Sequence, residues 1–163
     1  MRRAGGVVAT LIFAVSALAM ASQSPQVRNV RRELIHASLH PSPLYPTRIP
    51  QKISCCQAQL NRHGSHFTVS FTNGSRNPVL VDYSRLGKRT LGRYIKFTHA
   101  QRHRVRHERV GGRRVVFART DVTFFFGWHA QGYSYVVDSH YTGHVKPRDL
   151  RKMVASARPL PTS

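Results

Sequence analysis

The chain has 163 residues and carries 26 Lys and Arg against 6 Asp and Glu, a formal net charge of +20. This length accommodates one domain and a leader. The two cysteines, Cys55 and Cys56, are adjacent, which excludes a zinc site built from two cysteine pairs.

Residues 1–21 have the pattern of a signal peptide. Arg2 and Arg3 form a basic beginning, 7–20 is mostly apolar, and Ala19-Met20-Ala21 is a cleavage signature before Ser22. The apolar run is short for a mature membrane-spanning helix, which needs about 20 residues, and a retained N-terminal anchor is the alternative. We expect the mature protein to be secreted or to stay at the cell envelope.

The mature chain keeps 24 Lys and Arg against 6 acidic residues, a net charge of 24 − 6 = +18. Such a charge favours contact with polyanions. The expected partners are an anionic cell-envelope polymer, an anionic lipid surface or an acidic protein. Nucleic acid is expected to bind only non-specifically, because no helix-turn-helix or zinc-finger motif is present. The alternative is that arginine richness reflects genome composition alone.

Five prolines between residues 22 and 50 predict a linker, partly disordered, with one short helix over 30–39. A single domain is expected over 51–159, followed by a tail at 160–163. Adjacent Cα atoms lie about 3.8 Å apart, closer than an ordinary disulfide allows, so a bridge between Cys55 and Cys56 would be strained. One buried and one exposed thiol is expected, and the alternatives are an intermolecular disulfide or a redox role.

Alternating or apolar runs predict most of the strands of this domain. These runs are 53–60, 67–71, 79–83, 94–98 and 113–119. The segment 101–110 is nearly all charged and is expected to form the first arm of a hairpin. Residues 84–93 are expected to form a loop or a short helix. Gly111-Gly112 predicts the turn of a hairpin.

The stretch 113–157 organises the chain. Val122, Phe124, Phe126 and Trp128 share one face of a predicted strand, and Tyr133, Tyr135 and Val137 return on one face after a loop at 129–132. Leu150, Met153, Val154 and Ala157 recur at helical spacing after Pro147. The sequence therefore predicts an α+β fold, an antiparallel sheet of about 5–7 strands covered by a C-terminal helix.

The end of the chain resembles a family. Its features are Val122 to Trp128, Gly132-Tyr133-Ser134-Tyr135, and the helix from Leu150 to Ser156, preceded by a proline-flanked beginning at Tyr45-Pro46. The family is the small extracytoplasmic α+β domain of unknown function at the C-terminal end of some bacterial anti-sigma factors and in secreted or lipid-anchored bacterial proteins. The match covers mainly residues 110–159. The resemblance implies a sensing or binding module and no reaction.

A basic hairpin is the first candidate site. Six arginines could form a comb toward phosphates or carboxylates, and the alternative is a solvated surface. They are Arg102, Arg104, Arg106, Arg109, Arg113 and Arg114.

The histidines and the aromatic residues are the remaining candidate groups. His99, His103 and His107 recur every four residues, a weak alternative for a metal site that is otherwise not expected. The aromatic residues are expected in the core, or alternatively along a groove for a small ligand or lipid. They are Phe124, Phe126, Trp128, Tyr133 and Tyr135.

No catalytic constellation is visible, so a non-enzymatic protein without a cofactor is expected. Asp82 is interpreted as a strand-end residue and Asp138 as a strand-surface residue. The third interpretation is a basic secreted hydrolase or nuclease.

Overall fold

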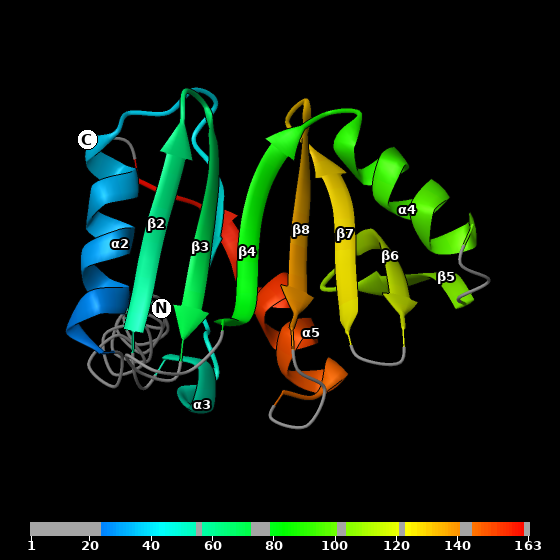
Figure 1. Ribbon diagram of the computed structural model, residues 1–163. Helices are drawn as coiled ribbons and strands as arrows, with labels where there is room; N and C mark the ends of the chain where they lie inside the picture. The colour runs from blue at the N-terminus through cyan, green and yellow to red at the C-terminus, as the bar shows by residue number, and fades with distance from the viewer. Residues whose placement is uncertain are drawn as a thin grey trace, which may run out of the picture.

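The hairpin of β7 (Phe124–Ala130) and β8 (Tyr133–Ser139) lies near the middle of a seven-stranded antiparallel sheet (Figure 1). Phe124 and Phe126 enter one buried cluster and Phe125 enters another, so the predicted alternation of faces is confirmed. The turn is tighter than the expected loop at 129–132. Only Gln131 and Gly132 form it, with φ of +54° and +80°, as a two-residue loop that follows the strand twist requires.

The computed structural model describes residues 24–54, 57–72, 79–100, 104–120, 123–140 and 145–161. The predicted leader, Cys55, Cys56, Arg102, His103 and Val122 lie outside these residues. Among the described helices, none is long and apolar enough to span a membrane.

The order of the strands brings distant parts of the chain together. The sheet runs β2-β3-β4-β8-β7-β6-β5. Helix α4 (Thr90–Ala100) carries the chain from the middle of the sheet to its far edge, and the last four strands return as a meander. The remaining strands are β2 (Gln57–His63), β3 (His66–Thr72), β4 (Val79–Gly87), β5 (Arg104–Val110) and β6 (Arg113–Arg119). Because β8 returns beside β4, Asp82 pairs with Asp138.

The predicted C-terminal helix is α5 (Pro147–Ser156), and it covers one face of the sheet. Its apolar stripe, Leu150, Met153 and Val154, is fully buried. Ala157 starts a short strand, β9 (Ala157–Pro159), which pairs with β1 (Leu44–Pro46) in a separate two-stranded sheet. The predicted α+β fold with a helix-covered antiparallel sheet is confirmed.

The segment expected as a linker instead contains structure. Its helix α2 (Pro25–His36) begins at Ser24, whose side chain accepts a hydrogen bond from the Val27 backbone at 3.3 Å. Val27, Val30 and Leu34 enter the large core cluster. The short helix α3 (Gln51–Ser54) follows, joined to α5 by a 2.5 Å ion pair between Lys52 and Asp149. The prolines flank the helices, so they do not prevent folding.

The predicted strand at 94–98 is wrong, because these residues belong to α4. Leu91 and Thr98 are buried and Ile95 packs beside Leu91, which is helical spacing. Leu91 sits on Gly127 of β7, where any Cβ would collide with the Leu91 side chain. Helix α4 therefore covers only part of the second face. Beyond it, Thr68 and Ser70 of β3 remain partly exposed on that face.

Candidate functional site

The predicted basic hairpin forms as β5 and β6, but its arginines lie on two faces. Arg104, Arg106 and Glu108 alternate with Val105, His107 and Arg109 along β5. The first set shares its face with Phe117 and α5, whereas the second faces the side covered by α4. The comb predicted from the sequence is therefore divided by the pleat of the strand.

Arg113 was predicted to be one of the anion-binding arginines, but its guanidinium is directed at the end of α5. Its guanidinium donates to the carbonyl of Val154, at 3.0 Å, and to the carbonyl of Ala157, at the C-terminal end of α5. Burial, followed by the charge of Arg158, lowers the pKa of Arg113. The last carbonyls of a helix lack intrahelical donors, so Arg113 completes the end of α5. Its role is structural.

A groove opens between the hairpin and the beginning of α5, and we call it the arginine groove. It has a volume of about 700 Å³. Its lining is Arg104, Val105, Arg106, Phe117, Arg119, Pro147 and Arg151. Arg119 and Arg151 were not among the residues predicted from the sequence. Arg151 comes from α5, so only the packing of helix on sheet adds it to the hairpin arginines.

Two of the guanidinium groups of this groove lie over aromatic rings. The Arg106 guanidinium lies 4.5 Å from the centre of the Phe117 ring, and that of Arg151 lies 5.5 Å from the centre of Phe126. Glu108 accepts two 3.0 Å hydrogen bonds from Arg151 and lies 3.6 Å from Arg106. One carboxylate thus orients two of the four guanidinium groups by forked hydrogen bonding and stacking.

Two pairs of arginines lie directly across the hairpin from each other. Arg104 is opposite Arg119 on the groove side, and Arg109 is opposite Arg114 on the other side. All four side chains are exposed, and none forms an ion pair within the described residues. Like charges in directly opposed positions cost about 0.2–1 kcal/mol per pair. A bound anion between Arg104 and Arg119 would remove that cost.

A second hollow is lined by Arg48, Lys152 and Arg158, among others. Arg158 already donates to the carbonyls of Ala155 and Ala157, at 3.1 and 2.8 Å. Among the described residues that line this hollow, none is aromatic. It is therefore less suited to hold an anion than the arginine groove.

The remaining candidate residues are separated or buried. His99 lies in α4 and His107 in β5, so these two are on different elements. Phe124, Phe126, Trp128 and Tyr135 are at most 2 % exposed and belong to the core, while Tyr133 is half-buried at its margin. In the part of the chain that the structure describes, the exposed aromatic side chains are instead Tyr94 and Phe97 of α4, at 41 % and 64 %.

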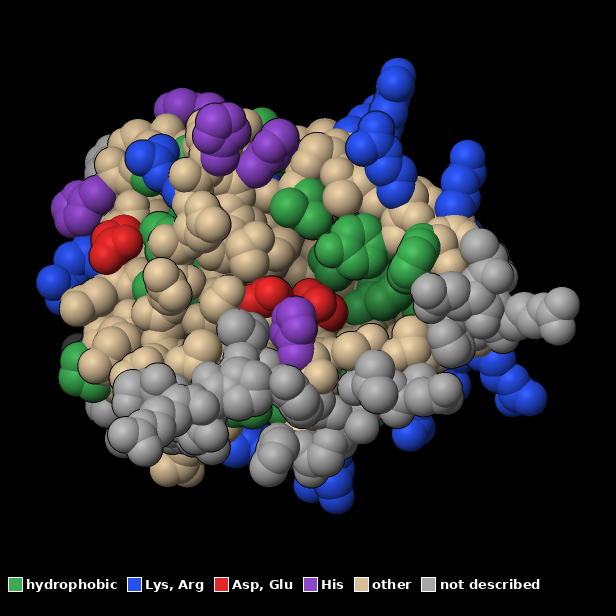
Figure 2. Space-filling view, viewed as in Figure 1, with side chains coloured by type: hydrophobic (Ala, Val, Ile, Leu, Met, Phe, Trp, Pro, Cys, Tyr) green, Lys and Arg blue, Asp and Glu red, His purple; other side chains and the backbone are tan. Residues whose placement is uncertain are grey.

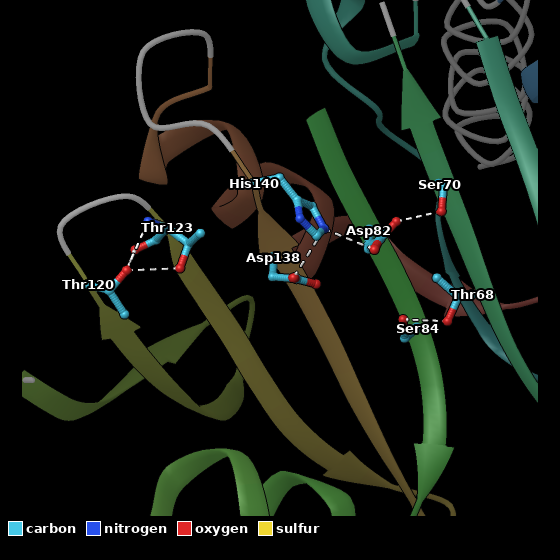
Figure 3. A network of polar contacts seen from close by, with 8 residues as sticks. All are labelled: Thr68, Ser70, Asp82, Ser84, Thr120, Thr123, Asp138 and His140. Atoms are coloured by element: carbon cyan, nitrogen blue, oxygen red, sulfur yellow. Dashed lines mark hydrogen bonds and ion pairs between the residues drawn. The ribbon is translucent and has the colours of Figure 1, made fainter. Parts of the chain in front are cut away.

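A cluster that the sequence analysis did not bring together lies on the opposite face of the sheet. Asp82 of β4 and Asp138 of β8 are cross-strand partners, and His140 follows β8 on the same side (Figure 3). The His140 Nε2 atom lies 3.0 Å from Asp82 and 3.5 Å from Asp138. The Ser70 hydroxyl donates to Asp82 at 2.6 Å. We call Asp82, Asp138 and His140 the carboxylate–histidine cluster.

The environment of this cluster alters its acidity. Burial, followed by the negative charge of Asp82, raises the pKa of Asp138 to about 6, and His140 opposes the shift. Tyr94 of α4 lies nearby, and burial with the charges of Asp138 and Asp82 raises the pKa of its hydroxyl. Figure 2 shows two acidic side chains and a histidine near the middle of this face, beside hydrophobic groups, with Lys and Arg mostly toward its margins.

The cluster brings two carboxylates and an imidazole together, and the oxygen and ring-nitrogen atoms that could bind a metal ion lie within 4.8 Å of one another. The sequence contains one local signal for it, because Asp138 lies near the end of β8 and His140 follows two residues later. Asp82 carries no such signal, since its place follows from the pairing of β4 with β8.

Comparison of the chain with known protein families, with curated proteins and with solved structures finds no match. The resemblance to an extracytoplasmic domain of unknown function stays a prediction.

Proposed function

We propose that this protein is a non-enzymatic binding domain of the cell envelope that holds an anionic partner in the arginine groove. The observation that carries the proposal is the convergence of Arg104, Arg106, Arg119 and Arg151 around Phe117. A positive chain can owe its charge to composition, but in this groove Arg104 and Arg119 are directly opposed and form no ion pair within the described residues. An anion would satisfy both guanidinium groups.

The location of the protein belongs to the same proposal. The basic and apolar leader directs the chain out of the cytoplasm, and residues from Ser22 onward form the mature protein. Determining the first residue of the protein recovered outside the cytoplasm tests this point. A mature chain beginning at Ser22 supports export, whereas an intact leader on a cytoplasmic protein contradicts it.

Binding to the groove is tested with matched pairs of substitutions on the two faces of one hairpin. The first variant carries Arg104→Gln and Arg119→Gln, and the control carries Arg109→Gln and Arg114→Gln. Both lose two charges from directly opposed positions. The probes are an anionic wall polymer, vesicles that contain phosphatidylglycerol, and double-stranded DNA, each across a salt series.

We expect the groove variant to lose at least about tenfold in affinity for one probe, because each lost charge-assisted contact is worth about that factor. The control variant should keep its affinity within about threefold. An equal loss in both variants would mean that binding depends on total charge and would overturn the groove as the site. Absence of binding to every probe would overturn the proposed function.

A further inference from the structure

Strand β5 is the outer edge of the sheet. It pairs with β6 on one side, and no described strand pairs with the other side. The opposite edge, β2, is flanked by helix α2 (Figure 1). Helices α4 and α5 also contact β5, but they do so through side chains on its two faces, Val105 toward α4 and Glu108 toward α5. An edge strand without a strand partner offers a row of backbone N–H and C=O groups to an added strand.

The side chains of this edge are predominantly positive on both faces. Arg104 and Arg106 point toward the arginine groove, and Arg109 lies on the opposite face. Glu108 is the one acidic residue of β5, and Arg151 already occupies it through two hydrogen bonds. An added strand would therefore meet positive charge wherever it placed a side chain beside these arginines, and Arg104 and Arg109 form no ion pair within the described residues.

The spacing of the arginines matches an extended ligand. Residues two apart on a strand are separated by about 6.6–6.8 Å, and this holds for Arg104 and Arg106 as for alternate residues of any extended peptide. Acidic residues at alternate positions would thus meet Arg104 and Arg106 in register. Arg119 and Arg151 also line the arginine groove, so they add two further positive groups for the acidic side chains of the ligand.

A second copy of this chain does not fit the edge. Two β5 strands side by side would bring their arginines together in a protein whose net charge is +20. Like charges in cross-strand positions oppose pairing, and charged edges are a known protection against self-association. The same charge that rejects another copy attracts an acidic strand.

We propose that the partner of the arginine groove is an extended acidic peptide segment that adds to β5 as an eighth strand. The inference rests on the proposed function, because it names the partner of that site. Backbone hydrogen bonds supply the alignment, and alternate carboxylates contact Arg104, Arg106, Arg119 and Arg151. Specificity then depends on the backbone of the ligand as well as on its charge.

The experiment compares peptides of equal charge and different backbone with the full chain. The parent is a capped heptapeptide that alternates Glu and Thr. Two further peptides carry N-methyl groups on alternate residues, one series along each edge of the extended peptide, so that each loses the donors of one edge. Binding is followed by fluorescence anisotropy at low salt.

We expect the parent to bind and one of the two N-methylated peptides to bind at least about tenfold more weakly, because a strand uses the donors of one edge only. Changing Arg104 and Arg106 to Gln should weaken the parent by a similar factor. The matched variant with Arg109→Gln and Arg114→Gln should weaken it less, since those side chains lie on the opposite face.

The outcomes separate this inference from the proposed function. Equal binding of all three peptides would overturn strand addition and leave an anion-binding groove. Failure of the parent peptide, with retained binding of a polymer, vesicle or DNA probe at the groove, would also overturn the peptide partner alone. Failure of every probe would overturn both.

Discussion

Asp82 and Asp138 lie directly opposite each other on β4 and β8, and His140 contacts both carboxylates. Only six acidic residues occur in this chain, yet two of them are cross-strand neighbours in the sheet. Like charges at this separation repel unless a proton or a cation lies between them. His140 and the Ser70 hydroxyl moderate that repulsion.

This relationship predicts a pH-dependent stability that Asp138→Asn should change. The pKa of Asp138 is raised from 3.8 to about 6, so the folded state holds the proton more tightly than the unfolded state does. Stability from this group is complete below 3.8 and is lost as the pH rises through about 6. We expect Asp138→Asn to stabilise the protein by about 1–2 kcal/mol near pH 8 and to lose that advantage toward pH 4.

The control for this prediction is Asp149, whose pKa is shifted in the opposite direction. Burial alone would raise the pKa of Asp149, but hydrogen bonds from Lys52 and the Lys146 backbone lower it overall. Its stabilisation is present above 3.8 and is lost as the pH falls. Asp149→Asn should therefore destabilise the protein near neutral pH by about 1–2 kcal/mol. Urea unfolding at several pH values measures both variants, and a destabilised Asp138→Asn near pH 8 would refute the assignment.

Arg113 is expected to stabilise the fold rather than bind a ligand. Arg113→Met removes two hydrogen bonds to the carbonyls of Val154 and Ala157. Hydrogen bonds from a charged group contribute about 1.5–3 kcal/mol, and partial exposure reduces this, so a loss of about 1.5–3 kcal/mol in total is expected. Arg114→Met, on the exposed neighbour, should change the free energy of unfolding by less than about 0.5 kcal/mol. Equal effects in chemical denaturation would contradict the structural role of Arg113.

Gly111 is predicted to tolerate no side chain, because the β5–β6 turn rests on α5. An added Cβ would lie 2.6 Å from the Cα of Ala155, and the φ of Gly111 is +57°. Gly112 also has a positive φ, +80°, but open space around it. We expect Gly111→Ala to destabilise by about 3 kcal/mol or more and Gly112→Ala by about 1–2 kcal/mol.

The contact at Gly111 is with backbone, which supplies a further check. Ala155→Gly removes the Ala155 methyl group but leaves its Cα and carbonyl in place. The double variant with Gly111→Ala should therefore remain as unstable as Gly111→Ala alone in thermal unfolding. Full rescue by Ala155→Gly would show that the turn does not rest on the helix backbone.

Arg85 is fully buried on β4 and forms no ion pair within the described residues. It donates to the carbonyls of Pro41 and His40, at 2.8 and 3.2 Å, and its guanidinium lies 3.8 Å from the centre of the Tyr133 ring. Arg85→Met leaves both carbonyls without these donors, so we expect a loss of about 2–4 kcal/mol. It should also increase proteolysis between α2 and β1.

Arg62→Met, at an exposed position of β2, is the matched control for Arg85. We expect a change below about 0.5 kcal/mol and no new cleavage site. If both variants unfold at the same denaturant concentration, Arg85 does not hold the connection to β1.

Local patterns predicted the C-terminal half of the fold. Phe124, Phe125 and Phe126 alternate between two buried clusters, and Leu150, Met153 and Val154 form the buried stripe of α5. These periods of two and 3.6 residues are properties of a single element and can be recognised without its neighbours. The helix predicted over 30–39 overlaps α2 only at 30–36, because the prolines made the segment before it read as a linker. The alternation of apolar residues at 94–98 suggested a strand where the structure has α4.

The sequence by itself determined the charge of the protein, the two faces of its strands and the apolar stripe of its last helix, because composition and period belong to the chain alone. Only the tertiary structure decided which charges meet. The pairing of β4 with β8 placed Asp82 beside Asp138, and the packing of α5 on the sheet placed Arg151 beside the hairpin arginines. Contacts between distant segments depend on sheet order and packing, and no local pattern encodes them.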